Sequence, residues 1–258
     1  NAAIKYFRGD KARIVITGKG IDVLKNLEKG DYKINYFDKY GKPTVKPAMT
    51  LPIPAGVTAT TVVDKYFEAI GGKDKVKAVK TTMMVANATI QGTPIVMTKK
   101  AFFSNKAAQL ISANGNVVQK TVFNGENGYV IARGQKVDMK PEEVEEAKKE
   151  NTIFSDLNYA TGKLVRIEPL DGKNAIVLEY NNTEIFYDMA SGLKVKEVKT
   201  VKIPNGKETK VPTVFSDYKE VNGIKFPHKM TQKMGPMNLV FDLKEVKINE
   251  GVSDADFK

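Results

Sequence analysis

Apolar and polar residues alternate over much of the chain from residue 81 onward. In 225–234 one face carries mainly apolar side chains, namely Phe226, His228, Met230, Gln232 and Met234. The following segment, 237–248, repeats the pattern with Met237, Leu239, Phe241 and Leu243. A period of two is that of a β-strand with one covered face and one solvated face. The pattern therefore predicts a sheet that packs on one side and meets water on the other.

Turn-forming pairs divide this region into short strands. Asn-Gly stands at 114–115, 124–125 and 205–206, and Asp-Gly or Ser-Gly separates other segments. Such pairs supply the positive φ angles that tight hairpins require. Between residues 81 and 248 they indicate about ten or eleven mostly antiparallel strands.

Helical periodicity is confined to a few segments. Thr58 can cap a helix that ends at Gly71 and has one apolar face, made of Val62, Val63, Tyr66, Phe67 and Ile70. A short turn is expected over 74–79, and a helix over 141–150 begins at a proline and has glutamates early and lysines late. We therefore expect a mainly β (α+β) fold, with a curved antiparallel sheet forming an incomplete, half-open β-barrel and two or three helices on its concave side.

Residues 1–50 differ in character from the rest. A β-branched strand is expected at 12–17 and another strand at 32–37, with a short helix at 21–27 between them. Because this piece is too small to enclose a core, 1–45 is interpreted as a small α/β fragment that docks on its neighbour or belongs to a larger domain. Prolines at 43, 47, 52 and 54 predict an extended linker over 46–56. The half-barrel domain would then span 57–258.

The apolar faces of the predicted strands supply candidates for a ligand cavity. The candidates are Met84, Met97, Tyr129, Ile131, Tyr187, Met230, Met234 and Phe241. The ordinary interpretation is that methionines on such a face fill irregular gaps in a core. The alternative is an adaptable lining for an apolar ligand, because methionine is unbranched and polarisable. A curved sheet with few helices to fill it favours the second interpretation.

Composition excludes most familiar catalysts. The chain has no cysteine and a single histidine, His228, so thiol chemistry, Cys-based zinc sites and multi-His metal cages are excluded. No nucleophile elbow or phosphate-binding glycine loop is present, and the acidic run in 141–150 is interpreted as a solvated helix face. We therefore expect no catalytic residue, no metal ligand and no cofactor in this chain.

The net charge of +11 comes almost entirely from lysine, since only four of the 41 basic residues are arginine. Nucleic-acid readers favour the bidentate fork of arginine, so no nucleic-acid partner is expected. The lysines from Lys194 to Lys210 are interpreted as the solvated side of a strand pair. No apolar run approaches the roughly 20 residues of a membrane span, although attraction to acidic lipid headgroups stays open. The missing initial Met and leader indicate a mature or truncated product.

Six phrases stand at 66–73 (YFEAIGGK), 123–129 (FNGENGY), 141–143 (PEE), 187–193 (YDMASGL), 216–227 (SDYKEVNGIKFP) and 246–257 (VKINEGVSDADF). In order and spacing, this region resembles the LolA-like outer-membrane lipoprotein-sorting proteins common in Bacteroidetes-type bacteria. The resemblance implies an incomplete antiparallel barrel whose cavity takes lipoprotein acyl chains. It also implies a secreted protein of the periplasm or cell envelope. The family has no catalytic residue to carry over.

Two further phrases, 12–18 (ARIVITG) and 36–43 (YFDKYGKP), are similar to the tail of insulinase/pitrilysin-type zinc peptidases. In such fusions the LolA-like module follows the peptidase repeats. The HxxEH zinc motif of that family is absent here, so zinc and proteolysis cannot be assigned to any residue of this chain. The hypothesis is that the chain is the C-terminal part of an envelope zinc peptidase, with the peptidase domains as partners.

The leading functional interpretation is a non-catalytic cell-envelope module that binds a hydrophobic ligand, either a lipid or a lipoprotein acyl chain. The helix at 141–150 is the candidate lid. The alternative is a ligand-free accessory domain that docks on the peptidase domains or presents substrate to them. A third interpretation, a basic surface for anionic lipid or polysaccharide, predicts binding that collapses with salt.

Overall fold

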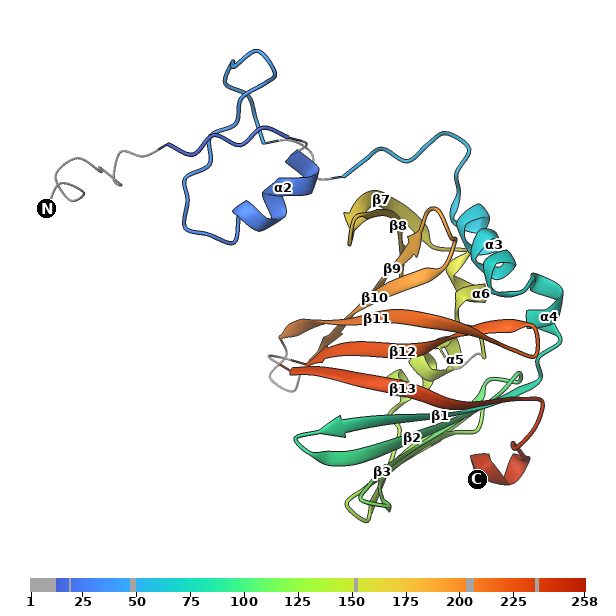
Figure 1. Cartoon of the computed structure of the whole chain (residues 1–258). Helices are drawn as coiled ribbons and strands as arrows, with labels where there is room; N and C mark the ends of the chain where they lie inside the picture. Colours follow the sequence, from blue (N-terminus) through green and yellow to red (C-terminus); the bar gives the residue numbers. More distant parts are fainter. Residues whose placement is uncertain (1–12, 19, 47–49, 151–152, 203–206, 235–236) are drawn as a thin grey trace, which may run out of the picture.

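The computed structural model describes residues 13–18, 20–46, 50–150, 153–202, 207–234 and 237–258 (Figure 1). Its main feature is a single sheet of thirteen strands in the spatial order β6-β5-β4-β3-β2-β1-β13-β12-β11-β10-β9-β8-β7. Each strand pairs with its neighbours in antiparallel register. β6 and β7 stand at the two ends of this order, so the sheet curves without closing into a barrel.

The strands follow one another along the chain with short connections. Their bounds are β1 Thr81–Ile90, β2 Thr93–Phe102, β3 Lys106–Ala113, β4 Asn116–Phe123, β5 Gly128–Ala132, β6 Gln135–Asp138, β7 Lys163–Leu170, β8 Lys173–Tyr180, β9 Thr183–Asp188, β10 Lys194–Lys202, β11 Glu208–Val221, β12 Ile224–Met234 and β13 Met237–Ile248. The expected half-open antiparallel barrel is confirmed, but the strands number thirteen rather than ten or eleven. One addition is β6, whose four residues are all exposed and therefore show no alternation.

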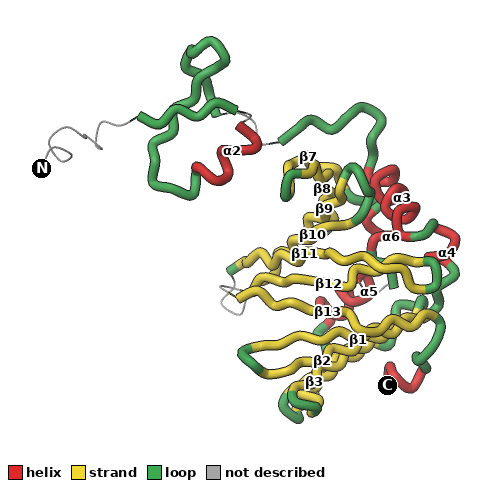
Figure 2. Tube along the Cα trace, viewed as in Figure 1, coloured by secondary structure: helices red, strands yellow, loops and turns green. Residues whose placement is uncertain are grey.

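The described part of the half-barrel domain contains four α-helices: α3 Ala59–Ile70, α4 Lys73–Lys77, α5 Pro141–Glu150 and α6 Asp156–Tyr159. A 3-10 helix, η2, follows at Asp254–Phe257. The expected cap of α3 is confirmed, because the Thr61 backbone N–H donates to the Thr58 hydroxyl over 3.2 Å. Sequence reasoning missed α6, which is a single turn. Figure 2 shows α3, α4 and α6 grouped at one end of the curved sheet.

The main core lies between α3 and one face of the sheet, which we call the inner face. Val63, Phe67 and Ile70 are almost fully buried on α3. They belong to one cluster with residues of several strands, including Leu178 and Ile185. Two smaller clusters lie on the opposite, outer face, one of which includes Phe257 of η2. The apolar face of α3 therefore holds the helix against the inner face of the half-barrel.

The N-terminal segment departs from the sequence prediction. Helix α2, Gly20–Leu27, confirms the helix expected at 21–27. Residues 13–17 and 32–36 form no strand, and the paired residues here are Phe37 and Pro43, which form an isolated bridge. Residue 12 lies outside the described part of the chain. A strand needs a partner, and Ile14 and Val15 are 76% and 84% exposed.

The end of the proline-rich segment is attached to the half-barrel. Leu51 forms an isolated antiparallel bridge with Ile167 of β7, through backbone hydrogen bonds of 2.7 and 3.4 Å. Ile53 and Val57 pack against the main core cluster. Residues 51–57 therefore run along the edge of the sheet before α3 begins.

Candidate functional site

Neighbouring strands β12, β13, β1 and β2 bring four of the predicted residues onto the inner face. The register places Met230 opposite Phe241, and Ala86 opposite both Leu243 and Met97. Met84, Met97 and Phe241 are half-buried and pack against the main core cluster. We call Met84, Met97, Met230 and Phe241 the methionine wall. These side chains keep part of their surface accessible, as a ligand-binding wall requires.

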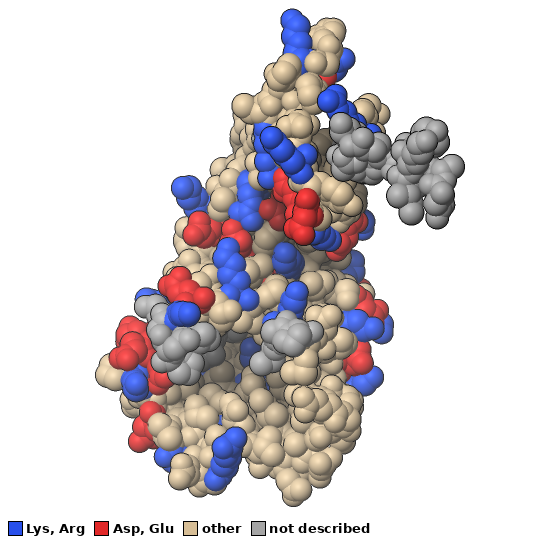
Figure 3. Space-filling model, turned by 90° about the vertical axis from the view of Figure 1, so that its left-hand side faces the viewer, with Lys and Arg blue, Asp and Glu red and all other residues tan. Residues whose placement is uncertain are grey.

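The end of the half-barrel beyond the methionine wall is open to view in Figure 3. This face of the molecule is hollowed in its lower half, and the side chains around that lower part are mostly uncharged. Lysine, arginine and the acidic residues are more frequent above it. The hollow lies at the end opposite to α3 and α4, since Figure 3 views the left-hand side of Figure 1.

Two predicted residues are placed elsewhere on or near the inner face. Tyr187 is 1% exposed and belongs to the packed core, with its ring 5.5 Å from that of Tyr66 on α3. It is therefore covered by the helix rather than open to a ligand. The backbone of Met234 ends β12, but its side chain lies outside the described part of the structure.

Tyr129 and Ile131 lie on the outer face, contrary to the expectation that they line the cavity. Tyr129 pairs with Val122, and both belong to the outer cluster that contains Phe257. The Tyr129 hydroxyl also donates to the carbonyl oxygen of Lys258 over 2.6 Å. Ile131 shares this face because it lies two residues further along β5. Both faces of β5 carry apolar residues, so alternation alone does not show which side chains face inward. The register of β5 with β4 decides it.

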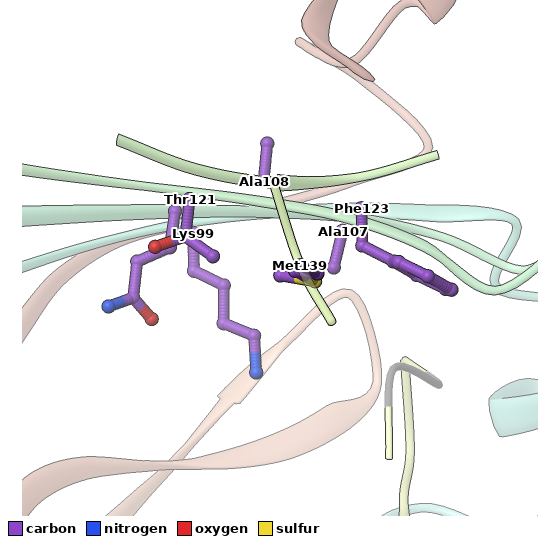
Figure 4. A pocket seen from close by; sticks show the side chains of 7 residues that line it. Lys99, Ala107, Ala108, Thr121, Phe123 and Met139 are labelled. Carbon is purple, nitrogen blue, oxygen red and sulfur yellow. The ribbon is translucent and has the colours of Figure 1, made fainter. Parts of the chain in front are cut away.

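A pocket of about 140 Å³ adjoins the methionine wall on strands β2, β3 and β4 (Figure 4). It is lined by Lys99, Ala107, Ala108, Gln109, Thr121, Phe123 and Met139. Met139 follows β6 and returns to the sheet, where its backbone N–H donates to the Gly128 carbonyl over 2.8 Å. A Cβ at Gly128 would lie 2.4 Å from the Met139 sulfur. Glycine at this position therefore lets Met139 lie against the sheet beside the pocket.

A buried ion cluster lies deeper on the inner face, between α6 and β10. The Lys194 ammonium is 2.8 Å from Asp156 Oδ2 and 2.9 Å from Glu197 Oε1, and Lys194 is 8% exposed. The Tyr187 hydroxyl donates to Asp156 Oδ1 over 2.7 Å. The ammonium also lies 5.1 Å from the ring centroid of Phe215. The prediction that Lys194 belongs to a solvated lysine face is therefore wrong.

The electrostatics of this cluster keep Lys194 charged. Burial opposes the charge, but the carboxylates of Asp156 and Glu197 outweigh it and hold the Lys194 pKa well above its ordinary value. Burial, helped by the nearby Asp156 carboxylate, raises the pKa of Tyr187 well above its ordinary value. Tyr187 therefore remains a hydrogen-bond donor. Because its groups are all engaged with one another, the cluster fastens α6 to the sheet.

Helix α5, the candidate lid, is mainly exposed and is attached near its C-terminal end. Asn105, in the β2–β3 turn, donates through its side-chain amide to the Lys148 carbonyl. Asn158 of α6 donates to the Lys149 carbonyl over 3.0 Å. At the other end, the Glu143 carboxylate accepts from the backbone N–H of Lys140 over 2.8 Å. Hydrogen bonds to Asn105 and Asn158 thus hold the C-terminal end of α5, while Val144 and Ala147 are half-buried along the helix.

The described residues do not assemble a catalytic or metal-binding group. Within the ranges given above, no three His, Asp or Glu side chains stand close enough to hold a metal ion. His228 lies half-buried, with its Nδ1 3.0 Å from the carbonyl oxygen of Phe226. None of the helices described here is long and apolar enough to span a membrane. What this face offers chemically is apolar surface with a few polar groups beside it.

Comparison with solved structures places this fold among known ones. A LolA superfamily protein from Nitrosomonas europaea superposes with a TM-score of 0.52 over 79% of this chain and 98% of that one, at 14% sequence identity. A DUF1329 family protein from Desulfovibrio piger gives a TM-score of 0.49 over 78% of this chain and 98% of that one, at 13% identity. The first of these superpositions shows that the fold is LolA-like. No protein-family model matches the sequence, and no curated protein matches it.

Proposed function

We propose that this chain is a non-catalytic cell-envelope module that holds a hydrophobic ligand, a lipid or a lipoprotein acyl chain, against the inner face of the half-barrel. The observation that carries the proposal is the methionine wall, where four apolar side chains from four adjacent strands remain half-buried beside a pocket. Burying an acyl chain there contributes about 0.8 kcal/mol per methylene before the costs of association. The LolA-like fold supports the same function.

Native mass spectrometry of protein purified without detergent tests this proposal directly. We expect a discrete additional mass that disappears after denaturing organic extraction, and its value would identify the lipid class. A bare polypeptide mass, together with no uptake of an apolar fluorescent probe, would contradict the proposal. The probe matters because a protein that loses its ligand during purification still binds a replacement.

Replacing Met230 with aspartate should weaken binding of the neutral probe N-phenyl-1-naphthylamine at least tenfold. A carboxylate on this wall must either lose its hydration against the ligand or admit water to it. Met230 suits the test because it lies outside the main buried cluster, so folding should be spared. Probe fluorescence measures binding, and circular dichroism checks the fold.

The matched control is Thr231→Asp, one residue further along β12 on the opposite face, where Thr231 pairs with Val240. This variant should bind the probe as the parent protein does. Equal binding by Met230→Asp and the parent would place the ligand elsewhere. Met84→Asp, Met97→Asp and Phe241→Asp are further tests of the same wall.

The alternative function, docking on peptidase domains of the same parent protein, is favoured by the exposed N-terminal segment. Ile14, Val15, Tyr32, Tyr40 and Val45 are all large apolar residues with high exposure. Such side chains are typical of a segment whose partner is another domain.

In the native organism, antibody to this chain would detect a larger precursor if the parent is a peptidase fusion. A band only near 28.5 kDa at every growth stage would count against that parent.

A further inference from the structure

A row of polar side chains crosses the inner face next to the methionine wall. Lys99 of β2 pairs with Gln109 of β3, and Gln109 pairs with Thr121 of β4. Residues that pair across adjacent strands share a face, so the three side chains stand side by side. All three line the pocket seen in Figure 4. The row joins an ammonium, an amide and a hydroxyl.

Apolar residues flank this polar row on both sides. One neighbouring row contains Met97 and Ile111, which are paired, and the other contains Ala107 and Phe123, which are also paired. Lys99 itself stands opposite Met84 of β1. The polar groups are therefore set into a mainly apolar surface, at the border between the pocket and the methionine wall. Gln119, which follows Ile111 in its row, is a further polar neighbour and donates to the Thr121 hydroxyl over 3.4 Å. A few placed polar groups in an apolar site are what fixes the orientation of a ligand.

The size of the pocket limits what it can hold. About 140 Å³ accommodates a small headgroup but not a long hydrocarbon chain. In Figure 4 the Lys99 side chain leaves the sheet on the same side as Met139 and Phe123, so its ammonium borders the pocket. Ala107, whose side chain is small, pairs with Phe123 and also lines the pocket. A hydrocarbon chain attached to the headgroup would have to extend along the methionine wall.

From this geometry we infer that the site selects a single-chain amphiphile with an anionic headgroup, a carboxylate or a phosphate. The headgroup lies against Lys99, Gln109 and Thr121, and the hydrocarbon chain lies along Met84 and Met97. The lysine supplies the opposite charge, while the amide and hydroxyl donate hydrogen bonds. This inference rests on the proposed function. It separates such ligands from acyl chains whose attachment carries no charge, because these would gain no electrostatic attraction from the Lys99 ammonium.

The experiment is competition against N-phenyl-1-naphthylamine, a neutral probe, by dodecanoate, dodecyl phosphate and dodecanol at neutral pH. These share one chain length and differ in headgroup. We expect at least one of the anions to displace the probe at about a tenfold lower concentration than dodecanol, since Lys99 is exposed and its attraction is partly screened. The more effective anion would identify the headgroup as carboxylate or phosphate.

The variant Lys99→Gln tests whether the preference for an anionic headgroup depends on the charge of Lys99 in the polar row. In this variant, dodecanol and the preferred anion should displace the probe at similar concentrations, so that the ratio of these concentrations falls to about one. The matched control is Lys120→Gln, because Lys120 pairs with Ile131 on the outer face and its ammonium lies 5.9 Å from the Tyr129 ring. This control should keep the tenfold ratio. A ratio that survives in Lys99→Gln would overturn the inference.

The outcomes distinguish the inference from the proposed function. Equal displacement by all three competitors in the parent protein would overturn the anionic preference while leaving hydrophobic binding in place. Failure of the probe to bind at all would overturn the proposed function itself. Raising the salt concentration should reduce the preference for the anion without affecting dodecanol, and a salt-independent preference would also contradict a role for the Lys99 charge.

Discussion

Replacing Lys194 with methionine should lower the free energy of unfolding by about 3–5 kcal/mol, because it leaves the buried Asp156 carboxylate and the half-buried Glu197 carboxylate without their counter-ion. Asp156 and Glu197 both contact the ammonium, at 2.8 and 2.9 Å. Asp156 is almost fully buried, so water cannot replace the lost partner. Equilibrium urea unfolding of the parent and the variant measures the loss.

Two further variants separate this cause from a general effect of losing a lysine. Lys196→Met, on the outer face over the Phe186 ring, should change stability by less than about 1 kcal/mol. The double variant Lys194→Met with Asp156→Asn should be more stable than Lys194→Met alone, because the uncompensated charge is reduced. If the double variant loses the sum of the two single effects, Asp156 and Lys194 do not act as a pair.

Replacing Gly71 with alanine should destabilise the protein by about 3 kcal/mol or more, since both the backbone and the surroundings oppose a side chain. Gly71 ends α3 with φ of 134°, which L side chains rarely adopt. A Cβ there would lie 2.1 Å from the carbonyl oxygen of Gly223, in the turn before β12. Either the helix or the hairpin must move. Thermal and urea unfolding report the effect.

The control for Gly71 is Gly92, in the β1–β2 turn. Its φ is also positive, at 81°, but no atom lies within 4 Å of a Cβ at this position. Gly92→Ala should therefore cost only the conformational penalty, about 1–2 kcal/mol. Similar losses in the two variants would show that the close approach of α3 to Gly223 contributes little.

Much of the fold could be predicted from local pattern. The apolar face of α3 and its stop at Gly71 were visible in the sequence, as were the period-two segments of β12 and β13. The exposed residues of β6 and the single turn of α6 carry no such pattern and were missed. The strand expected at 12–17 failed for a different reason: β-branched residues favour extended backbone, but pairing depends on a partner elsewhere.

The candidate site was predictable only as far as alternation defines a face. Alternation predicts that Met84, Met230 and Phe241 each lie on an apolar face of their strand. The register places these three and Met97 together on the inner face, although β2 also carries Lys99 on that face. Neither the polar row at Lys99 nor the ion cluster at Lys194 could be found this way. The row depends on the register of three strands. The cluster joins Lys194 to Asp156, 38 residues earlier in the chain.

The bridge between Leu51 and Ile167 has a mechanical consequence. The segment that connects residues 13–46 to the half-barrel is fastened to the edge strand β7 before it reaches α3. Tension along this segment, from any body that holds the N-terminal residues, would first load two backbone hydrogen bonds at that edge. Helix α3 would be shielded from the pull until the bridge separates, so the methionine wall would be insulated from movements at the N-terminal end.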